Sequence, residues 1–96
     1  MWFVYIIKCV DGSLYTGSTN DLASRFEKHK SGKGAKYTRS HKPQRIVFSK
    51  KYVNKIKALE KEREIKNLTR KEKIEFIQMN DMGMGLIKGL IVGTEQ

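Results

Sequence analysis

The stretch WFVYIIKCVDGSLYTG, residues 2–17, decides the fold. Its first half, residues 2–9, is rich in aromatic and β-branched residues, a composition typical of a β-strand. The alternation of a strand divides these side chains between two faces, with Trp2, Val4 and Ile6 on one and Phe3, Tyr5, Ile7 and Cys9 on the other. Because both faces are largely apolar, we predict a central strand that is covered on both sides.

A tight turn follows this strand. Asp11-Gly12 favours a type I′ turn, because both residues tolerate positive φ angles, and residues 13–17 then return as an antiparallel strand. Tyr5 and Tyr15 therefore lie on adjacent strands and can point into one shared space. Two interpretations of the pair stay open: the rings pack against each other on the sheet, or they face a substrate.

Residues 18–32 carry the signals of a helix. These signals are a capping residue, an apolar pair at i, i+4 and a terminating glycine, namely Thr19 or Asn20, Leu22 with Phe26, and Gly32. Arg25 and His29 are also four residues apart, so we expect them to share one side of this helix.

The second half completes an α/β domain of the α+β type. A third strand, residues 45–52, follows a loop whose turn residues are Gly32, Gly34 and Pro43. Two helices come next, and the residues that mark them are Asn54 before residues 55–67, Thr69 with Glu72 as a capping box, and Ile74 and Ile77 on an inward face. The order ββαβαα predicts a three-stranded antiparallel sheet flanked by helices.

The length of 96 residues predicts one domain, which we place at residues 2–80. The glycine-rich segment that follows, residues 81–96, shows no sustained helical period from Met82 onward. Two possibilities stay open for it: a loose tail, or an extra strand formed by GLIVG, residues 89–93.

Composition narrows the class of partner. The chain has 20 Lys+Arg against 10 Asp+Glu, a formal charge of +10 and a pI near 9.9, which indicates nucleic acid or an anionic membrane surface. A single cysteine, Cys9, excludes an internal disulfide and a cysteine-rich metal site, and we expect a core thiol. No signal-like or membrane-spanning apolar run occurs, so we predict a soluble, cytoplasmic protein that binds no membrane.

The positive charge is concentrated in one part of the chain. From Lys28 through Leu59 there is no Asp or Glu, yet 11 of the 20 basic residues lie there, with Tyr37, His29 and His41 among them. One interpretation is a solvated basic face without function; the other, which we favour, is a surface that binds a phosphate backbone.

A glutamate occupies an unusual position on the helix over residues 55–67. At about 100° per residue, Ala58, Leu59 and Ile65 define an apolar arc, and Glu62 falls near its middle. Glu60 and Glu64 point to the opposite side, where we expect ordinary solvent-facing charges. An inward carboxylate must be paired, protonated or bound to a metal. A salt bridge to Arg25 and a Mg²⁺ site are both open, since Mg²⁺ needs only one or two carboxylates.

The order of these residues resembles the GIY-YIG nuclease superfamily. FVY, a gap of nine residues and YTG are followed by Arg25, His29 and a glutamate on a later helix. More closely, VYIIKCVDGSLYTGSTNDLASRFEKHKSGKGAKYTRSHKP and ALEKEREIKNLTRKEK are similar to short stand-alone bacterial members, formerly an uncharacterised protein family. The resemblance covers about residues 2–77. Phe3-Val4 and Thr16 depart from the motif letters, and Ser18 stands where larger repair-type members have a lysine.

The resemblance implies a role for each matched residue. It makes one of the two motif tyrosines, Tyr5 and Tyr15, a general base on the attacking water, and gives Gly17 a tight backbone turn. It places Arg25 on the scissile phosphate and has His29 assist proton transfer. It assigns Glu62 a single Mg²⁺ or Mn²⁺ ion that neutralises the phosphate.

The resulting hypothesis is a metal-dependent endonuclease that hydrolyses phosphodiester bonds, with DNA expected rather than RNA. Binding to nucleic acid is assigned to the basic loop, through Lys33, Lys36, Tyr37, Arg39 and Lys42. A protein partner that supplies specificity is a further expectation. The alternatives are a nucleic-acid-binding module that does not cut, and a protein-interaction domain with a vestigial site.

Overall fold

The structure, a computed structural model, describes the backbone of residues 1–88 and the side chains of residues 1–80. Its elements are β1 (Trp2–Cys9), β2 (Leu14–Thr19), α1 (Leu22–Lys30), α2 (Lys36–Ser40), β3 (Pro43–Tyr52), α3 (Lys55–Lys66) and α4 (Arg70–Lys88). The strands form one antiparallel sheet in the order β2-β1-β3. Strand β1 is therefore central, and the predicted fold class is confirmed.

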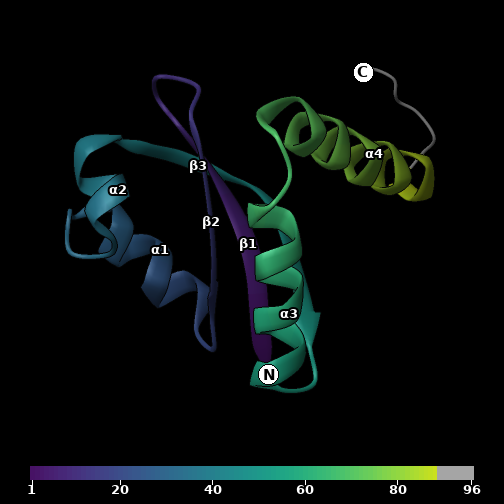
Figure 1. Ribbon diagram of the computed structural model, residues 1–96, viewed down its shortest axis with the longest axis horizontal. Coiled ribbons are helices and arrows are strands. Elements are labelled where there is room, and N and C mark those ends of the chain that lie inside the picture. The colour runs from purple at the N-terminus through teal and green to yellow at the C-terminus, as the bar shows by residue number, and fades with distance from the viewer. Residues whose placement is uncertain (89–96) are drawn as a thin grey trace.

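The two faces of β1 carry separate cores. One core consists of Val4, Ile6, Phe48, Ala58 and Ile65, and α3 and α4 cover it. The other is built on Tyr5, Ile7 and Cys9, against which Tyr15, Leu22, Phe26 and Ile46 pack. Figure 1 shows α1 and α2 on one side of the sheet and α3 and α4 on the other. The predicted division of the strand's faces is correct, and the free thiol of Cys9 is fully buried.

The hairpin turn differs from the prediction. The backbone N–H of Gly12 donates to the Cys9 carbonyl at 2.9 Å, and the N–H of Cys9 donates to the Ser13 carbonyl at 2.8 Å. Three residues therefore lie in the loop, not the two of a type I′ turn, and Gly12 has a φ of 87°. The Asp11 carboxylate holds the turn by accepting from the backbone N–H and hydroxyl of Ser13.

The helix caps agree with the sequence in two of three cases. Asn54 caps α3, and Thr69 and Glu72 form the predicted capping box of α4. Helix α1 is capped by Asp21, whose carboxylate accepts from the Ser24 N–H at 3.1 Å. Thr19 and Asn20 do not cap it. The Thr19 hydroxyl instead accepts from the backbone N–H of Asp21, the capping residue itself.

Two segments are more helical than predicted. Residues 36–40, expected as loop, form the short helix α2. Helix α4 continues to Lys88, so residues 82–88 are helical although their sequence shows no sustained period. A glycine inside a helix costs only about 1 kcal/mol relative to alanine, so it lowers helix propensity without necessarily ending the helix. The proposed strand at residues 89–93 lies outside the described residues.

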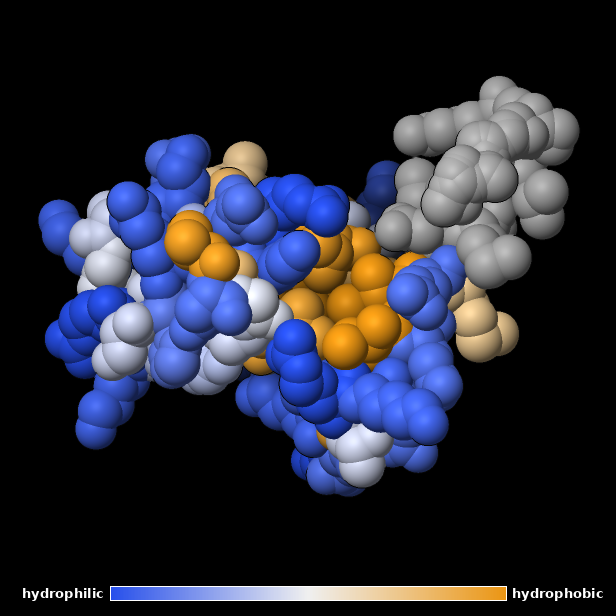
Figure 2. Space-filling view, turned by 90° about the horizontal axis from the view of Figure 1, so that it is seen from above, coloured by the Kyte–Doolittle hydropathy of each residue, from blue (hydrophilic) through white to orange (hydrophobic). Residues whose placement is uncertain are grey.

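A hollow of about 240 Å³ opens at the hairpin end of the sheet, next to α4. Leu14, Val47, Ile74 and Ile77 supply apolar surface to it, and Lys8, Arg45 and Arg70 supply positive charge. Figure 2 shows apolar surface at this end, surrounded by hydrophilic side chains. Within residues 1–88, no helix combines the length and the apolar character that a bilayer crossing requires.

Candidate functional site

Tyr5 and Tyr15 converge on the face of the sheet that α1 covers. Strand register pairs Tyr5 with Gly17 and Ile7 with Tyr15, so the two tyrosines occupy diagonal positions on one face. Their ring centroids are 6.3 Å apart and their planes differ by 43°. Tyr5 is only 1% exposed, whereas Tyr15 is half-buried and reaches solvent. The two rings therefore share one space, and Tyr15 forms its open side.

Gly17 leaves room for the Tyr5 phenol. A Cβ atom on Gly17 would lie 2.6 Å from the Tyr5 hydroxyl oxygen and 2.8 Å from Cζ, both shorter than any tolerated contact. It would also lie 3.1 Å from a ring carbon of Tyr15. The Tyr5 hydroxyl thus lies directly against the backbone of β2.

His29 is fully buried beside the two tyrosines. Its ring centroid lies 5.8 Å from that of Tyr5 and 5.0 Å from that of Tyr15. Its Nε2 atom is 2.9 Å from the Tyr5 hydroxyl, and its Nδ1 atom is 2.7 Å from the Thr38 hydroxyl. The Thr38 hydroxyl donates to the Ala35 carbonyl at 3.1 Å, so it accepts from His29. The proton of neutral His29 then lies on Nδ1, and Tyr5 donates to Nε2.

The pKa shifts agree with this proton arrangement. Burial, with a further contribution from the Arg25 charge, lowers the pKa of His29 from 6.5 to about 4. Burial also raises the pKa of Tyr5 to about 12, although Arg25 acts in the opposite direction. At neutral pH Tyr5 is therefore a protonated donor and His29 a neutral acceptor.

Arg25 lies beside both phenols, one helical turn before His29. The residue is half-buried, and the pKa of its guanidinium is raised, chiefly by its interaction with the Tyr5 hydroxyl and also by Tyr15. It therefore stays positively charged at the open side of the tyrosine pair. Within residues 1–80, Arg25 is the only charged residue of α1 that interacts with the two tyrosine rings.

Glu62 lies on the opposite side of the sheet, against β2. Its Oε1 atom accepts from the Ser18 hydroxyl at 2.6 Å, and its Oε2 atom lies 2.7 Å from Nζ of Lys66. Its side chain is 15% exposed. The predicted inward position is correct, but one of its two open explanations, a salt bridge to Arg25, does not form: the carboxylate pairs with a lysine one turn along its own helix. Leu59 is 40% exposed, so the predicted apolar arc was also wrong there.

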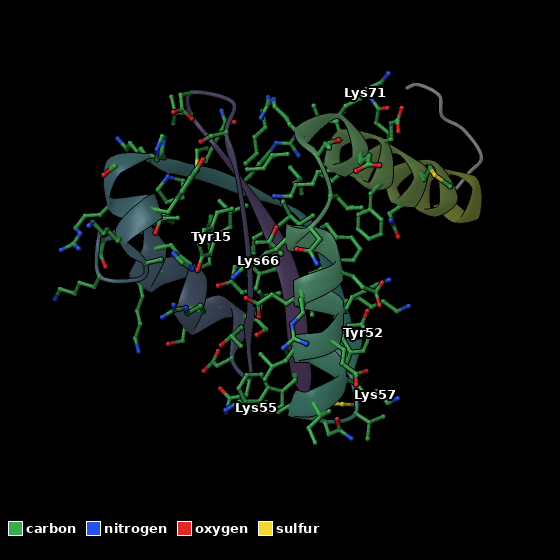
Figure 3. All side chains as sticks on the ribbon, viewed as in Figure 1. Tyr15, Tyr52, Lys55, Lys57, Lys66 and Lys71 are labelled. Carbon is green, nitrogen blue, oxygen red and sulfur yellow. The ribbon has the colours of Figure 1, made fainter. Side chains whose placement is uncertain are left out.

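The tyrosine pair and Glu62 lie on opposite sides of strand β2, against neighbouring residues of that strand. Gly17 lies against the Tyr5 hydroxyl, and the next residue, Ser18, binds Glu62 from the other face. The negative charge of Glu62 contributes to the raised pKa of Tyr5, after burial and Tyr15. Figure 3 shows Tyr15 on the α1 side of β2 and Lys66 extending from α3 toward the same strand. The candidate site is therefore centred on β2, the edge strand.

The donor set at Glu62 fits a single divalent ion. Among the described residues, no group of three or more His, Cys, Asp and Glu gathers to enclose a metal. A carboxylate and a neighbouring hydroxyl are hard oxygen donors, and Mg²⁺ keeps several waters and requires few protein ligands. A cation, the Lys66 ammonium, already lies against Glu62 Oε2. A single Mg²⁺ ion that keeps most of its waters would be compatible with this donor set, with Glu62 as its protein ligand.

The predicted nucleic-acid contacts gather around α2. Lys33, Lys36, Arg39 and Lys42 are exposed, and Tyr37 is half-buried. The Tyr37 ring lies 5.9 Å from that of Tyr15 and stacks on His41 at 4.2 Å. The acid-free run extends beyond α2, however, because Lys55 and Lys57 lie on α3, away from that helix (Figure 3).

Four residues of the site were not identified from the sequence: Gly34, Thr38, Ser18 and Lys66. A Cβ atom on Gly34 would overlap His29 Nδ1, so this glycine lets the loop approach the imidazole. Thr38 has no local signal, since its partner lies nine residues away. Lys66 did have a local sequence signal, because Glu followed by Lys at i, i+4 is a favourable pair on a helix.

Comparison with known proteins gives consistent matches. The family model of the GIY-YIG catalytic domain matches residues 1–75. A UPF0213 protein from Staphylococcus epidermidis is 51% identical over 76 residues, covering 79% of this chain and 93% of the relative. A UPF0213 protein from Staphylococcus aureus is 50% identical with the same coverage. The solution NMR structure of the UPF0213 protein BH0048 from Bacillus halodurans has a TM-score of 0.55 and 45% identity, over 82% of this chain and 85% of that one.

Proposed function

This chain belongs to the GIY-YIG catalytic domain family, and we propose that it is a metal-dependent endonuclease that hydrolyses phosphodiester bonds in nucleic acid. The observation that carries the proposal is the meeting of unlike groups at β2. Two phenols, an imidazole and a guanidinium lie on one side of this strand, and a carboxylate lies on the other. Packing alone does not explain a carboxylate on the inward face of α3.

The two tyrosines have different parts in this proposal. Tyr15 is the phenol that reaches solvent, so we assign it the contact with the attacking water, as the general base. Tyr5 is buried, protonated and hydrogen-bonded to His29, so this pair positions the site and does not contact the substrate. Hydrolysis by water requires no covalent intermediate.

Arg25 and Glu62 are the residues that we assign to neutralising the negative charge of the phosphate. Arg25, always positive, contacts the scissile phosphate and stabilises the negative charge that develops on its oxygens. Glu62 would hold a Mg²⁺ or Mn²⁺ ion, which would supply further positive charge to neutralise the phosphate and help the leaving oxygen depart. The exposed cations around α2 hold the flanking backbone.

The test is cleavage of DNA and RNA panels with Mg²⁺ or Mn²⁺ by three forms of the protein: wild type, Glu62→Gln and Glu60→Gln. Glu60 lies on the same helix but is exposed, so its variant controls for the loss of one charge. We expect Glu62→Gln to lower the cleavage rate about 100-fold or more and Glu60→Gln to leave it unchanged. A folded Glu62→Gln variant with full metal-dependent cleavage would overturn the proposal.

A second function is favoured by one observation: both carboxylate oxygens of Glu62 already have partners. A site closed in this way fits a module that binds nucleic acid without cutting it. That function predicts salt-dependent binding that survives chelation, with no cleavage by wild type under any divalent ion.

A further inference from the structure

The Lys66–Glu62 pair is unlike the other lysine–glutamate pairs of residues 1–80. Lys30–Glu27 and Lys61–Glu64 have N–O distances of 3.5 Å and 3.1 Å, and their glutamates are 71% and 68% exposed. The Lys66–Glu62 distance is 2.7 Å, and the Glu62 side chain is only 15% exposed. Exposed pairs contribute little to stability, whereas a mostly buried carboxylate needs a partner. Lys66 therefore balances a charge that the fold has partly removed from water.

The two partners of Glu62 differ in mobility. Ser18 belongs to β2, whose backbone is paired with β1, so its hydroxyl is fixed against Oε1. Lys66 is the last residue of α3 and its side chain is 51% exposed, with a flexible four-carbon stem. The ammonium can move into solvent without disturbing the core. Only one of the two carboxylate oxygens is therefore permanently occupied.

We propose that Lys66 is a resident cation that occupies the divalent-ion position on Glu62 and leaves when the ion binds. The proposal rests on the proposed function, since it concerns the ion assigned to Glu62. Both cations seek the same lone pairs on Oε2, and their positive charges prevent both from staying close to that atom. Binding of the ion is then an exchange of one cation for another.

This exchange sets the affinity of the site. If Lys66 holds Glu62 in about nine of ten free molecules, the apparent affinity for the ion falls about tenfold below that of the open carboxylate. The lysine keeps the carboxylate paired in the metal-free protein, so the site does not require an ion to remain folded. Lys66 thus makes metal binding weak and reversible.

The experiment measures the Mn²⁺ dissociation constant, from the EPR signal of free Mn²⁺, for wild type, Lys66→Met and Lys61→Met. Lys61 is a matched control because it lies on the same helix and pairs with Glu64, not Glu62. We expect Lys66→Met to bind Mn²⁺ about tenfold more tightly than wild type. We expect Lys61→Met to stay within about twofold, and Glu62→Gln to abolish the binding.

A second measurement uses wild type alone and does not depend on how a variant folds. The Lys66 ammonium resonance is followed by NMR as Mg²⁺ is added, and it should shift toward that of a free lysine as Glu62 fills. Equal or weaker Mn²⁺ binding by Lys66→Met, or an unchanged Lys66 resonance while Glu62 responds, would overturn the exchange. Absence of any binding to Glu62 in both wild type and Lys66→Met would instead contradict the metal site of the proposed function.

Discussion

The Tyr5 hydroxyl occupies the space that a side chain on Gly17 would fill. Strand alternation was enough to predict that Tyr5 and Tyr15 share a face, because both lie in regular strands with a period of two. The reason for the glycine was not predictable, since it depends on how closely the Tyr5 hydroxyl approaches the backbone of β2: a Cβ atom on residue 17 would lie only 2.6 Å from it. The environment of His29 was likewise only partly predictable. Helical spacing placed this residue on the same side of the helix as Arg25, but its burial depends on Thr38 and Gly34, which come from another segment.

The buried imidazole makes stability depend on pH. The pKa of His29 is about 4 in the folded protein against 6.5 in an unfolded chain, so between these values the unfolded state binds more protons. The free energy of unfolding should therefore fall as pH decreases from 6.5 to 4, by at most about 3 kcal/mol. Urea denaturation at a series of pH values measures this loss.

His29→Gln and His41→Gln separate this effect from general acid sensitivity. His41 is partly exposed and pairs with Asp11 on the hairpin, so its variant should keep the loss of stability between pH 6.5 and 4. His29→Gln should remove most of that loss, at the expense of lower stability at neutral pH. An identical pH profile for wild type and His29→Gln would contradict the neutral, buried state of this histidine.

Among the elements, α3 shows what a helical wheel can and cannot supply. The wheel identified Glu62 correctly, because Ala58, Glu62 and Ile65 follow the i, i+4, i+7 spacing of one face. It misplaced Leu59, which lies about 100° from Ala58 and turns out to be exposed. Helix α2 could not be predicted at all, since its five residues have no apolar period. Its Thr38 side chain ties it to Ala35 and His29.

Helix α2 carries the test of the nucleic-acid surface. Lys36→Ala with Arg39→Ala removes two exposed cations from it, and we expect the slope of log Kd against log salt to fall by about 2. The matched control, Lys57→Ala with Lys71→Ala, removes the same charge from α3 and α4, away from α2 (Figure 3). Fluorescence anisotropy with labelled oligonucleotides, at a series of salt concentrations, measures the slope for each double variant. Equal slopes for the two double variants would show that binding follows net charge and not the α2 surface.

For the whole molecule, the sheet both separates and joins the parts of the site. Apart from α2, the order of strands and helices followed from local patterns, because apolar alternation and capping residues act over a few positions. The arrangement of the site did not, because α1 and α3 lie on opposite faces of the sheet, and the charges of Arg25 and Glu62 reach Tyr5 from either side. Such an arrangement depends on strand order and register, which no single segment encodes.

Paramagnetic broadening by Mn²⁺ in the ¹⁵N-labelled protein tests this arrangement most directly. At low Mn²⁺ concentration, we expect the amide signals of Gly17, Ser18 and Glu62 to broaden first, followed by Tyr15 across the strand. Glu62→Gln should abolish this pattern. Broadening confined to the exposed carboxylates Asp11 and Asp21, with the signals of residues 17, 18 and 62 unchanged, would contradict a metal site at the edge of the sheet.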